Sequence, residues 1–136
     1  MQYMLIMRDS AEAQEAARDI PFDEVIAMMG RYNEELIAAG VLVSCEGLAP
    51  PEDGGFVVDF DGDSPTVTDG AYGPQQELFN GFWILDVKSR DDAIAWAGKC
   101  PLGPGTKLEV RRVPSLDEFP QDNEYIQKEK AWRDAR

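Results

Sequence analysis

Apolar and polar residues follow first a strand pattern and then a helix pattern along the first third of the chain. Tyr3 to Met7 is a short apolar run, typical of a strand. Farther along, apolar residues recur every three or four positions and predict an amphipathic helix; they are Phe22, Val25, Met29, Tyr32 and Leu36. Pro21 marks the start of this helix, and Gly40 suits its C-terminal cap.

The middle of the chain predicts three further strands. Residues 41–48 alternate well enough for a strand, which Pro50 and Pro51 end. Residues 56–60 and 66–68 predict a hairpin around the turn residues 61–63, Asp-Gly-Asp. Residues 82–87 are so apolar that both faces of their strand should be covered. Between these strands, residues 69–80 show no clear period.

A second helix and a last strand complete the pattern. Ser89 begins a capping sequence for a helix that Pro101 cannot continue, and residues 107–113 predict the last strand. The order β-α-β, hairpin, β-α-β predicts an α+β, ferredoxin-like fold with an antiparallel sheet and both helices on one face. We expect one domain over residues 1–113, followed by an acidic tail over 114–136 with a short helix around 125–132.

The charge of the chain argues against polyanionic partners. Twenty-six Asp and Glu residues stand against 13 Lys and Arg, a net charge of -13, and no basic residue occurs between Arg31 and Lys88. Proteins bind nucleic acid mainly by neutralising phosphates with basic side chains. We therefore expect no nucleic-acid binding and no attachment to an anionic membrane.

The chain contains no histidine, which removes the commonest metal ligand and the usual proton-transfer group. The acids at positions 59, 61 and 63 alternate as calcium ligands do, but Gly62 and Gly70 are misplaced for an EF-hand, so a solvated turn is favoured. We expect no metal and no cofactor. Cys45 and Cys100 form no metal-binding spacing and are expected to be free thiols of a cytoplasmic protein. Cys45 is either a nucleophile or an inert core thiol, and without a histidine to activate it the inert thiol is favoured. No secretory signal or membrane-spanning segment is predicted.

Five short blocks, in order, resemble the DGPF branch of the YCII-related family: residues 45–50, CEGLAP; 67–70, VTDG, followed by an aromatic; 81–83, GFW; 95–97, AWA; and 108–111, LEVR. Two departures are Ala71-Tyr72, where the branch name implies Pro-Phe, and the less charged residues 73–77. The resemblance covers residues 1–113 and implies a dimeric α/β-barrel type of ferredoxin-like protein with a pocket. It also implies that some relatives use a His-Asp pair, and that the wider group includes a dehalogenating enzyme of aromatic breakdown. Without histidine, this chain cannot use that route.

Four residues are candidates for a site on the sheet face opposite the helices. Strand alternation places Glu46 on that face together with Leu42 and Leu48, and places Arg111 opposite Leu108 and Val110. Glu46 and Arg111 either bind a ligand or form an ion pair with each other.

Asp69 and Tyr72 lie on the glycine-rich segment after the hairpin. Asp69 is either a catalytic base or part of a turn, and Tyr72 either contacts a ligand or packs as an ordinary aromatic residue.

Two classes of function remain open. The first is a protein that binds a small organic molecule on the open face and transforms it by carboxylate acid-base chemistry at Asp69, with Glu46, Tyr72 and Arg111 as ligand-binding residues. The second is a non-catalytic regulatory protein with a protein partner, because the resemblance implies an association with alternative sigma factors. In either case we expect a homodimer, since the open face presents apolar residues, either Phe82 with Ile84 or Trp83 with Leu85.

Overall fold

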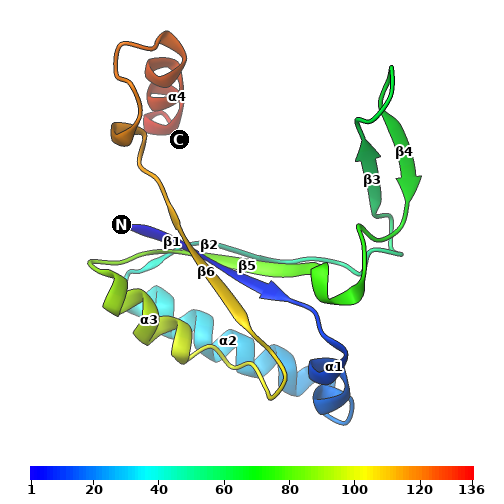
Figure 1. The fold of residues 1–136 in the computed structure, drawn as a ribbon. Helices are drawn as coiled ribbons and strands as arrows, with labels where there is room; N and C mark the ends of the chain where they lie inside the picture. Colours follow the sequence, from blue (N-terminus) through cyan, green and yellow to red (C-terminus); the bar gives the residue numbers. More distant parts are fainter.

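A four-stranded antiparallel sheet with two helices on one face forms the body of the protein (Figure 1). The structure is a computed structural model that describes residues 1–136. Its elements are β1 (Gln2–Arg8), α1 (Ala11–Ala17), α2 (Phe22–Ala38), β2 (Leu42–Gly47), β3 (Phe56–Asp59), β4 (Thr66–Asp69), the 3-10 turn η1 (Gln75–Glu77), β5 (Phe79–Asp86), α3 (Arg90–Gly98), β6 (Leu108–Val113), the 3-10 turn η2 (Leu116–Glu118) and α4 (Glu124–Asp134).

The strand order in the main sheet is β2-β5-β1-β6, and every neighbouring pair is antiparallel. The two strands of the hairpin, β3 and β4, form a separate ribbon. Counted without the hairpin, the main strands stand in the order second, third, first, fourth. This is the ferredoxin-like arrangement, and the predicted α+β fold is confirmed.

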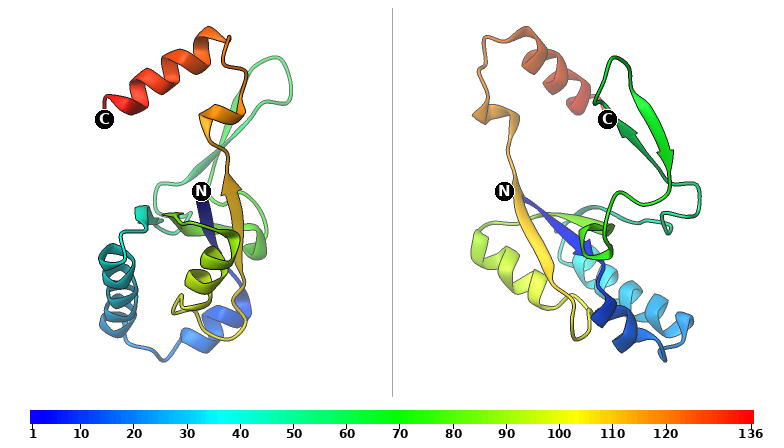
Figure 2. Two further views of the ribbon diagram at one scale, coloured as in Figure 1. Left: turned by 90° about the vertical axis from the view of Figure 1, so that its left-hand side faces the viewer. Right: turned by 45° about the vertical axis from the view of Figure 1, so that its right-hand side comes forward.

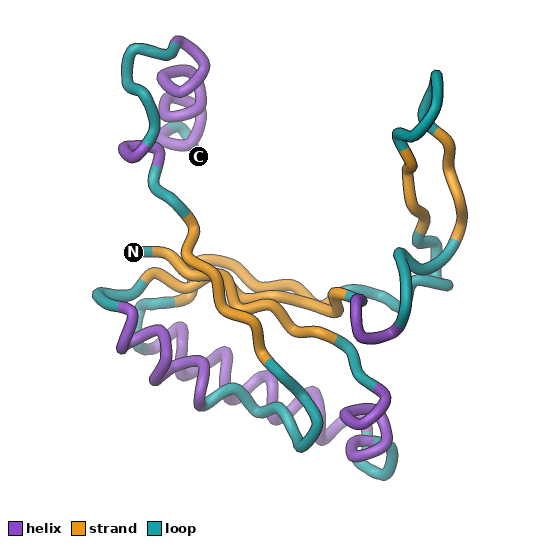
Figure 3. Tube along the Cα trace, viewed as in Figure 1, coloured by secondary structure: helices purple, strands orange, loops and turns teal.

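The core lies between the sheet and the helices α2 and α3, which share one side of the sheet (Figure 3). Alternate residues of β1 and β5 point into this layer, where they meet one face of each helix. Its buried members are Tyr3, Leu5, Tyr32, Leu36, Trp83, Leu85, Val87 and Ala93. Because burial of apolar area dominates folding free energy, this layer holds the domain together.

Local signals at the helix ends were read correctly in two cases and missed in one. The Ser89 hydroxyl accepts a hydrogen bond from the Asp92 backbone N–H at the start of α3, as predicted. Gly40 follows α2 with a φ of 72°, the left-handed conformation expected there. The short helix α1 was not predicted. It is capped by Ser10 but buries no residue, so its sequence carries no apolar period.

A bulge in β2 corrects one prediction about the sheet faces. Leu42 pairs with Leu85 but Ser44 pairs with Ile84, so Val43 is an extra residue in the strand. Leu42 therefore packs against the core instead of lying on the open face. Beyond the bulge, Glu46 pairs with Phe82 on the open face, as predicted.

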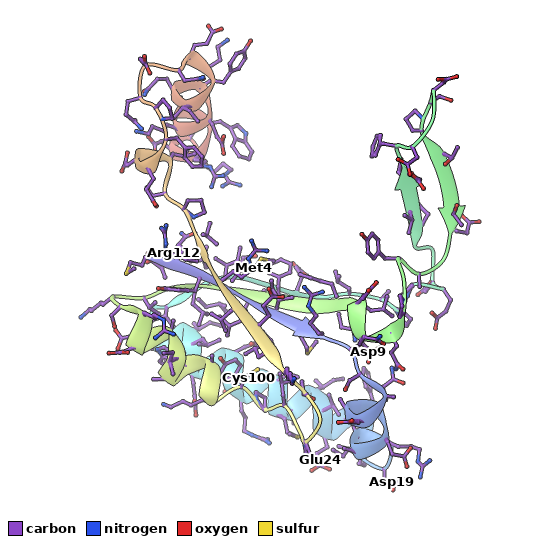
Figure 4. All side chains as sticks on the ribbon, viewed as in Figure 1. Met4, Asp9, Asp19, Glu24, Cys100 and Arg112 are labelled. Carbon is purple, nitrogen blue, oxygen red and sulfur yellow. The ribbon has the colours of Figure 1, made fainter.

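Two arms rise from opposite ends of the open face (Figures 1 and 2). The hairpin follows the end of β2, and the segment with α4 follows β6 at the other end. Between the arms, the centre of the face is apolar; Figure 4 shows Met4 on this side of the sheet, and register adds Ile6, Phe82 and Ile84. None of the helices combines the length and apolar character that a membrane-spanning segment requires.

Candidate functional site

A wide cleft lies between the N-terminal half of α2 and the end of the sheet where β2 stops and β5 begins. Its volume is about 900 Å³, within the range of small-molecule pockets. The apolar part of the wall is made by Met7, Phe22, Val25, Ile26, Met29, Leu48, Pro50, Pro51, Leu78, Phe82 and Trp83. The cleft therefore lies beside α2, and it also includes Glu46 and Phe82 of the open face, where the sequence placed the site.

Helix α2 divides its apolar residues between the core and this cleft. In the C-terminal half, Tyr32 and Leu36 are buried in the core. In the N-terminal half, residues at helical spacing line the cleft: Phe22, Val25, Ile26, Met29 and Asn33. Phe22 remains 75% exposed and Ile26 53% exposed. The chain thus presents apolar side chains to water where a ligand could cover them.

Close contact between two strands shapes the opposite wall. Gly47 of β2 pairs with Gly81 of β5, and a Cβ at Gly81 would lie 2.9 Å from the carbonyl oxygen of Glu46. Beyond this pair the Leu48 backbone N–H donates to the carbonyl of Asn80, at 2.9 Å. Position 81 must therefore be a glycine for β2 and β5 to approach this closely and form the wall.

A hydrogen-bonded aromatic group forms the back of the cleft. The indole N–H of Trp83 donates to the side-chain oxygen of Asn33 at 2.8 Å. The Trp83 ring also meets the Tyr32 ring edge to face, with centroids 5.6 Å apart. Both contacts fix Trp83, and the amide nitrogen of Asn33 is left as a hydrogen-bond donor.

All charged residues that line the cleft are acidic: Asp9, Glu46 and Glu52. Asp9 lies at the end of β1 (Figure 4), where its carboxylate accepts hydrogen bonds from the Ser10 backbone and the Gln14 side chain. Glu46 and Glu52 are exposed and take part in no ion pair within the chain. The cleft therefore has a negative potential that disfavours anionic ligands.

Two groups behind the cleft are unsuited to proton transfer near neutral pH. Burial raises the pKa of the Tyr32 hydroxyl, aided by the nearby Cys100 and Glu35, and this hydroxyl donates to the Trp96 carbonyl at 2.8 Å. Burial also raises the pKa of the Cys100 thiol to about 12. Both groups stay protonated, so neither supplies a base or a thiolate. No group of three or more His, Cys, Asp or Glu side chains is arranged to hold a metal ion.

The sequence model of the YCII-related domain family matches residues 1–116, which is most of the chain. The chain belongs to the YCII-related domain family. No protein of curated function matches its sequence.

Among solved structures, the YCII-related domain is similar to 5-chloro-2-hydroxyhydroquinone dehydrochlorinase from Burkholderia phenoliruptrix, in complex with 2,5-dihydroxybenzoquinone. The match covers 88% of this chain and 100% of the other, with 15% sequence identity and a TM-score of 0.44. This likeness is too low to bear on the site.

Two of the four predicted site residues lie at neighbouring hollows of the YCII-related domain. Glu46 lines the α2 cleft. Tyr72 is 77% exposed and lines a second hollow of about 570 Å³ beneath the hairpin. The two hollows are adjacent because they share four wall residues, namely Leu48, Pro51, Leu78 and Asn80.

The other two residues lie elsewhere. Asp69 ends β4 opposite Phe56, exposed and in no hydrogen bond between side chains. Arg111 lies on β6, the sheet edge opposite to β2 and Glu46, so an ion pair between them within one chain is impossible. Instead, Glu109 pairs with Arg8 at 2.8 Å. The structure therefore does not bring the four residues into one site within a chain, and their roles stay predictions.

Sequence reasoning missed the contribution of α2 to a hollow. Phe22, Val25 and Met29 were predicted only as part of the apolar face of an amphipathic helix, and Ile26 and Asn33 were not singled out. The signal was a wide apolar stripe at the start of the helix, where Val25 and Ile26 are adjacent. When the apolar stripe of a helix is wider than the face that packs on the sheet, the extra residues indicate a second apolar surface.

Proposed function

We propose that this YCII-related domain binds a small, largely apolar organic molecule without negative charge in the cleft beside α2. The observation that carries the proposal is a cleft of about 900 Å³ in which exposed Phe22 and Ile26 face a fixed tryptophan. Such a site combines apolar walls with a few polar groups that orient a ligand.

The energetics favour a ligand that covers the start of α2. Full burial of a Phe or Ile side chain is worth about 1.5–3 kcal/mol, and a bound molecule would recover part of this for Phe22 and Ile26. The donor of Asn33 and the carboxylate of Glu46 would engage polar groups of the ligand. Because Glu46 lacks a basic partner, an amine or hydroxyl group suits it and a carboxylate does not.

We propose further that the chain is a homodimer formed through the open sheet face. The centre of this face presents Met4, Phe82 and Ile84, each partly exposed, beside Ile6, which is already buried. A two-fold partner would cover this stripe with the same residues of its own sheet. Light scattering should give the mass of two chains, and the mass of one chain would contradict the dimer.

The ligand class is tested with three probes that share one ring: phenethyl alcohol, phenethylamine and phenylacetate. We expect the alcohol and the amine to raise the melting temperature at millimolar concentration, because a ligand that binds only the folded chain stabilises it. Phenylacetate should leave the melting temperature unchanged, because the acidic side chains of the cleft repel its carboxylate. The measurement is thermal unfolding followed by circular dichroism.

A variant with Glu46→Gln and Glu52→Gln separates charge from shape. Removing both carboxylates should let phenylacetate bind with an affinity near that of the alcohol. Equal shifts from all three probes with the native chain, or no shift from any, would contradict the proposal.

A further inference from the structure

Two arms of this protein lack a core of their own. The hairpin arm comprises residues 49–72 and the tail arm residues 114–136. In the hairpin arm Val58 pairs with Val67 and shares a face with Phe56. Phe56 and Val67 each expose more than half of their surface. A two-stranded ribbon that packs on nothing is only marginally stable in water, and it needs a further strand or a helix on its apolar face.

The tail arm has the complementary deficiency. Helix α4 has 11 residues, too few for a stable isolated helix. Tyr125 and Trp132 lie two turns apart on one side of it and are 69% and 58% exposed. Yet the arm is well ordered at its base, where hydrogen bonds from Arg112 and Ser115 lower the pKa of Glu118 to about 2. An ordered base thus holds a mostly polar helix that exposes two large aromatic side chains to water.

The two arms of one chain cannot meet. Val113 pairs with Gln2 at the start of β1, and Phe79 pairs with Arg8 at its end, so the arms stand at opposite ends of this strand. From Gln2 to Arg8 the strand rises by six steps of about 3.3 Å, which separates the ends by roughly 20 Å. Both arms project from the open side of the sheet (Figure 2). Any cover for either arm must come from another molecule.

We propose that in the homodimer the tail arm of each chain packs on the hairpin arm of the other. The inference rests on the proposed homodimer and is independent of ligand binding in the cleft.

When two sheets pack face to face, the two-fold axis lies between them. An axis along the strands would bring like arms together, whereas an axis across the strands brings each hairpin arm to a tail arm.

Charge distinguishes the two arrangements. The hairpin arm carries six acids and no base: Glu52, Asp53, Asp59, Asp61, Asp63 and Asp69. Two hairpin arms side by side would repel each other. The tail arm also carries six acids, but all four of its bases lie within residues 128–136: Lys128, Lys130, Arg133 and Arg136. Three of these bases form ion pairs within the arm, namely Lys128, Lys130 and Arg133. Pairing of unlike arms therefore avoids placing two wholly acidic hairpin arms side by side, and it covers the exposed apolar side chains of α4 and of the hairpin.

The arrangement has a consequence for the second hollow. Phe56 and Val58 line this hollow together with Tyr72. A tail arm seated on that face of the hairpin places Tyr125 and Trp132 of the second chain beside it. The hollow under the hairpin would then be completed by the other copy.

Cysteine cross-linking of the full chain tests the pairing. In a background with Cys45→Ala and Cys100→Ala, one chain carries Val67→Cys and a differently tagged chain carries Tyr125→Cys. Both positions are exposed, so folding should survive. After co-expression, a short bismaleimide should join the two kinds of chain to each other. Each variant expressed alone should give no linked dimer, and an Ile37→Cys chain, altered on the helix side, should link to neither.

Links between two Val67→Cys chains, or between two Tyr125→Cys chains, would overturn the arrangement while leaving the dimer intact. A chain that carries both Val67→Cys and Tyr125→Cys provides a further check. If mass spectrometry found a link between these two positions within one chain, in the absence of dimer, the arrangement would also be overturned. A monomeric mass in light scattering would refute the dimer and the arm pairing together. A thermal shift by phenethyl alcohol remains a separate readout, so failure of the arms and failure of the cleft are distinguishable.

Discussion

The hydrogen bond between Trp83 and Asn33 explains why an amide stands on the apolar side of α2. A buried indole N–H needs an acceptor, because an unpaired donor costs about 1–3 kcal/mol. The Asn33 oxygen supplies it at 2.8 Å. The same contact places a polar group at the back of an otherwise apolar cleft. A residue required by the fold thus also offers a donor to a ligand.

Cys100 makes the stability of the chain sensitive to alkaline pH. Burial raises the pKa of its thiol from 9.0 to about 12. Between these values the unfolded chain loses this proton and the folded chain keeps it, so the free energy of unfolding falls as pH rises from 9.0 towards 12. Cys100→Ala should make the fall less steep in urea denaturation at a series of pH values. Because Tyr32 acts in the same direction, part of the fall should remain. An equally steep fall in the variant would contradict the assignment.

At the scale of elements, the contact between β2 and β5 depends on one glycine. Gly81→Ala would place a Cβ 2.9 Å from the Glu46 carbonyl oxygen, so β2 must move or the chain is destabilised by about 1–3 kcal/mol. The matched control is Gly47→Ala, its partner across the same pair, where a Cβ meets nothing within 4 Å. Urea denaturation should show a lower midpoint for the first variant alone. Equal midpoints would refute this account of the wall.

The sequence predicted most elements because their apolar periods and end signals are local. The helix ended by Gly40 and the helix capped by Ser89 are both present. The bulge at Val43 was not predictable, since it depends on how β2 pairs with β5. The division of α2 between core and cleft is also tertiary: the period identifies an apolar face but not what covers each half.

At the scale of the molecule, the order of the strands determines which side chains on one face of the sheet lie close together. Alternation assigns a side chain to a face of the sheet but says nothing of its strand's position within it. Glu46 and Arg111 were therefore placed together, although they lie on opposite edge strands. The charge asymmetry was visible in the sequence, but the structure was needed to show that the wholly acidic hairpin and the tail segment that carries four bases lie at opposite ends of one face.

The central claim is that a ligand binds beside α2, and the shift in melting temperature caused by phenethyl alcohol tests it most directly. Ile26→Trp fills the cleft and should abolish the shift. Ile37→Trp, at another exposed position of the same helix outside the cleft, should retain it. Asp69→Asn should also retain it, because Asp69 lies outside the cleft. A shift that survives Ile26→Trp, or one that disappears in Asp69→Asn, would contradict the account and favour a site at the hairpin.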